Sequence, residues 1–201
     1  MKKIPLAFYS RTDVVSIAKE LLGKIIVTNF DHQLTSARIV EIEAYIAFTD
    51  RASHSFNGKR TPRNEHMYGK PGTAYVYICY GLHHMMNIVT NDPGIPDAVL
   101  IRAAEPIRGR DVMCVRTGKK WPDTSITRGP GNVGKALGIV KQHSGYSLSG
   151  NRIHLIEDDF QLDAAQIGTS KRIGVESAGE GATLPYRFYL RGNRYVSGSN
   201  T

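Results

Sequence analysis

The longest strand-forming pattern in the chain runs from Thr73 to Thr90, with the sequence TAYVYICYGLHHMMNIVT. Its first half is almost entirely β-branched or aromatic, and its second half is apolar with a polar opening, as expected of two paired strands. A glycine at the first of two central positions, here Gly81 followed by Leu82, is typical of a type II′ turn. The pattern therefore predicts a β-hairpin with Tyr80 opposite His83 and Leu82 at its tip.

The other hydrophobic patterns predict short elements that are joined by polar turns. Asp13 is a suitable N-cap for an amphipathic helix at 14–22, and Gly23 is a suitable residue to end it. Polar loops are expected at 47–71 and 117–127, and the polar tail from Gly192 is expected to fray. Further helices are predicted at 108–115 and 128–139, and further strands at 24–30, 34–44, 98–103, 154–156 and 187–190.

These elements indicate one α+β domain over 1–201, with its core at about 5–197. Hairpins rather than helical crossovers connect most strands, which favours a curved, mostly antiparallel or mixed sheet with flanking helices and a protruding β-hairpin. No apolar run approaches the roughly 20 residues of a membrane span. The N-terminal stretch lacks the apolar segment of a signal peptide, so we expect a cytoplasmic protein.

The charge of the chain favours a polyanionic partner. Lys and Arg number 26 against 18 Asp and Glu, giving a net charge of +8. The polyanionic partner of such a protein is most often nucleic acid, although many basic proteins bind nothing acidic. The basic residues lie mainly in loops rich in Gly, Pro and Thr, which suits contacts to a phosphate backbone. The two cysteines, Cys79 and Cys114, are expected to be reduced thiols. Neither they nor the histidines have the spacing of a metal site, so no metal or cofactor is predicted.

Two carboxylates interrupt an otherwise apolar strand. Glu41, Glu43 and Tyr45 fall on one face of the 34–44 strand and its end, because side chains alternate along a strand. One interpretation is an ordinary solvated or salt-bridged glutamate; the other is a carboxylate that acts as a general base on water. Arg102, at the end of the apolar run AVLIR, could pair with such a carboxylate and keep it ionised.

The sequence GPGNVGK, at 129–135, matches only part of a phosphate-binding loop. Ala136 stands where an NTPase needs a hydroxyl for magnesium, and no apolar strand precedes the motif. Two interpretations remain: the start of the helix contacts a DNA phosphate, or its glycines serve helix packing.

Together these features are what an enzyme acting on a base in duplex DNA needs, namely a basic surface, an aromatic wedge, stacking walls and a carboxylate. Long motifs in order carry a more specific resemblance: VEIEAY, TPRN, KPGTAYVYICYG, MNI, LIRAAEP and GPGNVGKAL, with FYSR near the start and RFYLRGN near the end. The chain resembles the alkyladenine DNA glycosylases, the mammalian-type 3-methyladenine DNA glycosylase family, over about 5–197.

The resemblance implies a role for each matching residue. Glu43 matches the carboxylate that activates the attacking water, and Arg102 the arginine that helps to position it. The residues implied in base binding are Tyr45, His54 and Tyr77, which wall the pocket, and Asn87, which disfavours the exocyclic amino group of guanine. The residues implied at the tip are Tyr80, which fills the gap in the duplex, and Leu82. Contacts to the DNA backbone are predicted for Lys59, Thr61, His83, Gly131, Lys135, Lys171 and Arg172.

The function implied is a monofunctional, metal-free hydrolase that flips damaged purines out of double-stranded DNA and starts base excision repair. We expect a monomer, because one duplex site needs only one wedge. The alternative from another class is a non-catalytic protein that binds lesions or bent DNA and retains the pocket. The preference among 3-methyladenine, 7-methylguanine, hypoxanthine and ethenoadenine does not follow from the sequence.

Overall fold

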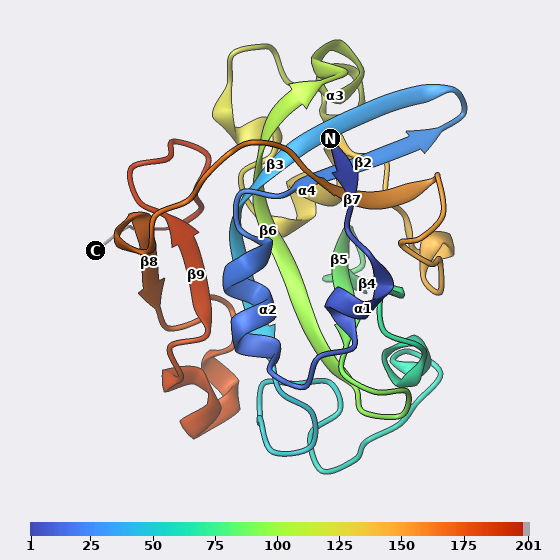
Figure 1. Cartoon of the computed structure of the whole chain (residues 1–201), viewed down its shortest axis with the longest axis vertical. Helices are drawn as coiled ribbons and strands as arrows, with labels where there is room; N and C mark the ends of the chain where they lie inside the picture. Colours follow the sequence, from blue (N-terminus) through green and yellow to red (C-terminus); the bar gives the residue numbers. More distant parts are fainter. Residues whose placement is uncertain (199–201) are drawn as a thin grey trace.

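The computed structural model of the chain, described for residues 1–198, is built on one large antiparallel sheet (Figure 1). The main strand order is β1-β7-β2-β3-β6-β5-β4, and β9 adds to β3 and carries β8. The strands are β1 (Lys2–Lys3), β2 (Ile25–Phe30), β3 (Gln33–Tyr45), β4 (Ala74–Cys79), β5 (His83–Thr90), β6 (Asp97–Arg108), β7 (Ile153–Glu157), β8 (Ile167–Ser170) and β9 (Arg187–Leu190). The predicted α+β class with a mostly antiparallel sheet is confirmed.

Short helices flank this sheet. They are α1 (Leu6–Tyr9), α2 (Val14–Leu21), α3 (Arg110–Thr117) and α4 (Pro130–Ala136), with 3-10 turns η1 (Glu65–Tyr68), η2 (Thr124–Ile126), η3 (Lys141–His143), η4 (Ala164–Gln166) and η5 (Glu176–Thr183). The predicted first helix and its cap are confirmed, because the Asp13 side chain accepts a hydrogen bond from the Ser16 amide. In Figure 1, α2 crosses the face formed by β3 and β6, against which it packs.

The long strand β3 exchanges partners halfway along its length. Its first half pairs with β2 and its second half with β9, while β6 follows its other edge. The register between β3 and β6 is irregular around Glu41, where the pairing skips Val40 on one strand and Arg102 on the other. Such bulges redirect side chains and are common near functional sites.

The two faces of the central strands differ in character. Val40, Ile42 and Ala44 point into the main hydrophobic core beneath α2. The alternate residues of β3, Glu41 and Glu43, are also fully buried but lie on the opposite face. The predicted alternation along this strand is therefore confirmed, and it places two carboxylates in the interior.

The hairpin of β4 and β5 is confirmed, but its predicted turn is wrong. Cys79, not Tyr80, pairs with His83. Tyr80 and Gly81 form the turn, with φ of 51° and 69°, and the Leu82 amide donates to the Cys79 carbonyl. Two left-handed residues correspond to a type I′ turn, whose twist suits the hairpin, and this moves Tyr80 from the strand into the tip.

The tail from Gly192 does not fray over its described part. Tyr195, Val196 and Ser197 are buried, because the first two complete the main core and Ser197 donates hydrogen bonds to Glu41. The prediction of a frayed tail is wrong for these residues, and its last three positions, 199–201, lie outside the described residues. Across residues 1–198, no helix combines the length and apolar character needed to cross a bilayer.

Candidate active site

A row of four residues crosses neighbouring strands on the face opposite α2. Glu43 of β3 pairs with Leu100 of β6, Leu100 with Asn87 of β5, and Asn87 with Tyr75 of β4. Side chains of directly paired residues lie on the same face of a sheet. The register therefore brings a carboxylate, an amide and a tyrosine from distant parts of the sequence into one line.

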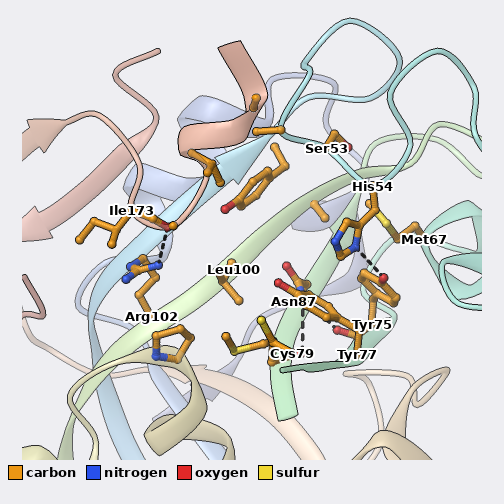
Figure 2. A pocket seen from close by; sticks show the side chains of 18 of the residues that line it. Ser53, His54, Met67, Tyr75, Tyr77, Cys79, Asn87, Leu100, Arg102 and Ile173 are labelled. Atoms are coloured by element: carbon orange, nitrogen blue, oxygen red, sulfur yellow. Dashed lines mark hydrogen bonds between the residues drawn. The ribbon is translucent and has the colours of Figure 1, made fainter. Parts of the chain in front are cut away.

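This row is part of a cavity of about 470 Å³, a size that is typical of small-molecule sites. Figure 2 shows His54, Tyr75, Tyr77 and Asn87 gathered at one end and Arg102 at the other, close to Ile173. The other lining residues include Tyr45, Arg51, Arg63, Cys79, Tyr80, Met85, Leu100, Pro130 and Val175. The structure thus brings the predicted wall residues, Arg102 and the hairpin tip to one cavity.

Glu43 lies behind the cavity wall rather than on its surface. Its side chain has 0% exposure. One carboxylate oxygen accepts from the Ile173 amide at 2.8 Å and lies 3.2 Å from the Arg102 guanidinium. The other oxygen accepts from the Tyr45 hydroxyl at 2.7 Å. The predicted pairing between Arg102 and a strand carboxylate is confirmed.

Burial is the largest influence on Glu43 and raises the pKa of its carboxyl above the ordinary value. Arg102, the Ile173 amide and the Tyr45 hydroxyl act in the opposite direction, whereas the negative charge of Glu41 adds to the rise. A carboxylate with a raised pKa is a stronger base, which is the property that proton removal from water requires.

One aromatic wall of the cavity is formed by His54, Tyr75 and Tyr77. His54 Nδ1 lies 2.9 Å from the Tyr75 hydroxyl, and its ring packs edge-on to Tyr77 with centroids 4.6 Å apart. Burial, followed by the positive charges of Arg63 and Lys59, lowers the pKa of His54 to about 4, so the imidazole is neutral at pH 7. This wall therefore presents uncharged aromatic surface.

A loop asparagine fixes this wall. Asn64 donates to the carbonyls of His54 and Lys59, and its side-chain oxygen accepts from both the amide and the hydroxyl of Thr61. Thr61 is thus part of a hydrogen-bonded loop that holds His54 in place. Asn64 is a positioning residue that sequence reasoning missed, although it ends the motif TPRN.

Arg172 supports the Tyr45 wall from inside the protein. Its guanidinium lies 4.6 Å from the Tyr45 ring centroid, donates to the Ala44 carbonyl and forms a bidentate ion pair with Asp50. The side chains of Arg172 and Asp50 are 0% and 1% exposed. The predicted backbone contact of Arg172 is not supported by this conformation, because the side chain is buried and its terminal nitrogens are already paired, although its Nε has no hydrogen-bond partner.

Asn87 is buried at the centre of the row. Its side-chain nitrogen lies 3.3 Å from the Tyr75 carbonyl and 3.5 Å from the Met85 carbonyl. These two contacts orient the carboxamide. On its other side, Asn87 pairs with Leu100 of the neighbouring strand β6. The amide is therefore held at a fixed position in the cavity wall.

The hairpin tip extends into solvent beside the cavity. Tyr80 is 90% exposed and Leu82 is 71% exposed, although Tyr80 also borders the cavity. Two large apolar side chains exposed next to each other at a hairpin tip, beside a cavity, are available for contact with a partner. The wedge role of Tyr80 and Leu82 stays a prediction.

The glycines of α4 serve packing against this hairpin. A Cβ on Gly131 would lie 2.6 Å from His83 Nδ1, and one on Gly134 would lie 2.1 Å from the His84 carbonyl oxygen. Any larger residue would push the helix away from β5. The packing interpretation of GPGNVGK is supported, and exposed His83 lies against the helix start.

The other predicted backbone contacts are exposed. They are Lys59, before η1; Lys135, on α4; and Lys171, after β8. Arg51 and Arg63 border the cavity itself, and sequence reasoning assigned neither of them. Their position as basic residues in the polar loop 47–71 is the sequence signal that could have identified Arg51 and Arg63. Across residues 1–198, no group of three or more His, Cys, Asp or Glu side chains could hold a metal ion.

The chain is similar to known proteins over nearly its whole length. Residues 7–194 match the family model described as methylpurine-DNA glycosylase. A protein of Desulfitobacterium hafniense with the provisional name 3-methyladenine DNA glycosylase is 44% identical, over 98% of this chain and 99% of that protein. A Chlamydia abortus protein with the same provisional name is 41% identical, over 93% and 97%. These matches confirm the resemblance, and the chain belongs to the methylpurine-DNA glycosylase family.

Proposed function

We propose that this protein is a monofunctional DNA glycosylase that removes alkylated or deaminated purines from duplex DNA. The observation that carries the proposal is the pair of Glu43 and Arg102 beside an aromatic cavity, next to the exposed tip residue Tyr80. A base inside a duplex cannot reach such a cavity. The nucleotide must be extruded, and the gap must be filled by a side chain from the minor groove.

Binding of the damaged base would use the two walls. The base stacks between Tyr45 on one side and His54 with Tyr77 on the other, and the backbone of His54 contacts its edge. Alkylation at N3 or N7 makes a purine cationic, and uncharged aromatic faces attract cations. Burial raises the pKa of Tyr77 to about 12, so its ring is neutral at pH 7. We assign to Asn87 the exclusion of normal guanine, whose exocyclic amino group would meet the fixed carboxamide.

The chemical step is hydrolysis of the N-glycosidic bond. Ionised Glu43 removes a proton from water, and the water oxygen bonds to C1′ while the C1′–N bond breaks. The bonding electrons go to the departing base, which leaves neutral when it was a cationic alkylpurine. The products are the free base, an abasic sugar and a protonated Glu43. Arg102 orients the water and keeps the carboxylate ionised before attack.

Two further properties follow from the cavity. Among the described residues that line it, none is a lysine, which supports simple hydrolysis without a Schiff base and without strand cleavage. Hypoxanthine is a neutral base and needs protonation to leave, and we assign no general acid. The exposed residues Lys59, Lys135 and Lys171 are our candidates for DNA-backbone contacts, in a monomer that acts on chromosomal DNA in the cytoplasm.

The enclosure of Glu43 favours a second candidate, a lesion-binding protein without catalysis. Single-turnover release of hypoxanthine from an inosine duplex, and of methylated purines from alkylated DNA, separates the two when EDTA is present. Release of either base supports a metal-free glycosylase. Tight binding without release of any base supports the binding protein instead.

The role of Glu43 is tested by Glu43→Gln. This variant should bind a lesion duplex as the wild type does, because the amide keeps the shape of the side chain. Base release should fall by about 100-fold or more, since a missing general base typically costs two to four orders of magnitude. Undiminished release would remove Glu43 from its assigned role.

A further inference from the structure

A second buried carboxylate stands beside the proposed catalytic pair and has no role in the chemistry described above. Glu41 precedes Glu43 by two positions on β3, shares its face and has 0% exposure. Its carboxylate accepts from Arg102 Nε at 2.9 Å, from Arg187 Nε at 2.8 Å, and from the Ser197 amide and hydroxyl at 2.6 and 2.9 Å. Three of these donors contact one oxygen and the Ser197 amide contacts the other, so Glu41 is engaged by more protein donors than Glu43 and is less available to water.

The contact from Glu41 fixes the orientation of Arg102. A guanidinium is planar, so holding its Nε also sets the direction of the two terminal nitrogens. One of these lies 3.2 Å from Glu43, and the other lies 3.3 Å from the Ser197 hydroxyl. Glu41 and Ser197 together therefore hold the edge of Arg102 that faces Glu43. The irregular register between β3 and β6 occurs at these same residues, as expected where a bulge redirects side chains.

Glu41 also balances the charge around the pair. The buried group contains two carboxylates, Glu41 and Glu43, and two guanidiniums, Arg102 and Arg187. Without the charge of Glu41, Glu43 would lie beside an excess of positive charge. It would then be more easily ionised and a weaker base, because basicity falls as the acid form becomes stronger.

We propose that Glu41 is a positioning residue that orients Arg102 toward Glu43 and limits the effect of its positive charge, which keeps Glu43 basic enough to remove a proton from water. The proposal rests on the glycosylase function proposed above. It assigns different tasks to two carboxylates on one strand face: Glu43 acts on water, and Glu41 acts only through Arg102.

The consequence is visible in the pH dependence of base release. Several charged or titratable groups face Glu43 from the surrounding elements: Glu41 and Tyr45 on β3, Tyr77 on β4, Arg102 on β6, and Arg172 after β8, with Arg187 on β9 facing Glu41. Glu41→Gln removes one negative charge from this set and keeps the side-chain shape. The pKa of Glu43 should fall, so the acid limb of the rate profile should move to lower pH.

The experiment measures single-turnover base release and lesion-duplex binding across the acid range for four full-length proteins. They are the wild type, Glu41→Gln, Ser197→Ala and, as a matched control, Glu157→Gln, which removes a remote carboxylate that pairs with Lys24. We expect Glu41→Gln to lower release about tenfold or more, since a hydrogen bond between charged groups is worth that factor. Binding should stay within about twofold, and the acid limb should shift downward. Ser197→Ala should lower release by a smaller factor without moving the limb, because it alters no charge.

Each outcome decides between the proposals. Wild-type protein that releases no base overturns the glycosylase function and this inference together. An active wild type with Glu41→Gln equal to Glu157→Gln in rate and pH profile overturns the role of Glu41 alone. The role of Glu41 is also overturned if Glu41→Gln lowers stability but leaves the acid limb of the pH–rate profile where it is in the wild type. That result indicates a purely structural role. If Glu41→Gln does not fold, an unchanged rate in Ser197→Ala overturns the proposal, and a reduced rate with intact folding and binding supports it.

Discussion

Removing Asp50 should destabilise the protein strongly, because its partner is a buried guanidinium. The carboxylate of Asp50 and the side chain of Arg172 are 1% and 0% exposed, and Arg172 has no other negative partner in its ion pair. Asp50→Ala leaves the charge of Arg172 buried and uncompensated, which costs about 3–5 kcal/mol. For a chain of this size, about 2–4 °C per kcal/mol converts this cost to a fall in Tm of roughly 6–20 °C.

The matched control is an ion pair of the same chemistry at the surface. Arg60 and Glu65 are 57% and 50% exposed, so Glu65→Ala should change the free energy of unfolding little, because solvent screens an exposed ion pair. Urea unfolding of both variants at pH 7 measures the two free energies directly. If Asp50→Ala costs no more than Glu65→Ala, then the Asp50–Arg172 pair does not hold a buried charge in solution, and the reasoning fails.

The same substitution should affect base release. Arg172 lies against the Tyr45 ring, so a guanidinium released from Asp50 no longer holds that wall in place. Misplacing a bound group by about 1 Å can cost about 100-fold in rate. In single-turnover assays well below its Tm, Asp50→Ala should therefore lose more activity than its unfolded fraction accounts for, whereas Glu65→Ala should match the wild type.

Three other predictions concern the hairpin tip and the titration of the site. Tyr80→Ala should reduce flipping, seen with a fluorescent base beside the lesion, and leave Tm unchanged because the side chain is exposed; equal flipping would remove the wedge role. Base release by the wild type should fall as the pH is lowered through the raised pKa of Glu43, because only the ionised carboxylate can accept a proton. His54 has a pKa of about 4, so its titration does not cause this fall. Tyr45→Phe keeps the ring but removes a donor that lowers the Glu43 pKa, so the acid limb should move to higher pH; a limb shifted the other way would refute the assignment.

Local patterns were sufficient to predict much of this fold. The Asp13 cap, the strand alternation at 34–44 and the apolar hairpin arms each depend on residues close in sequence. Alternation alone placed Glu41 and Glu43 on one face. The position of Arg102 at the end of the apolar run AVLIR indicated a partner from another strand, and the two ion pairs confirm that pairing.

Predictions failed where a distant partner determines the conformation. Arg172 looked like a surface cation because its partner, Asp50, is far away in the sequence, and the polar tail looked mobile because nothing local shows that Ser197 is needed by Glu41. The hairpin turn failed for another reason. A tyrosine with a positive φ is uncommon. The backbone preferences of single residues therefore favoured Gly81, not Tyr80, at the first position of the turn.

The contacts of Glu43 also link base binding to water activation. The carboxylate has 0% exposure and three protein donors cover its two oxygens, so water can reach it only when a neighbouring group moves. The Ile173 amide belongs to the backbone, and Arg102 is held by Glu41. The Tyr45 hydroxyl is the donor that a side-chain rotation can remove. Because Tyr45 is also a wall of the cavity, the same side chain contacts the carboxylate and would contact a bound base, which is the physical link between base binding and water activation.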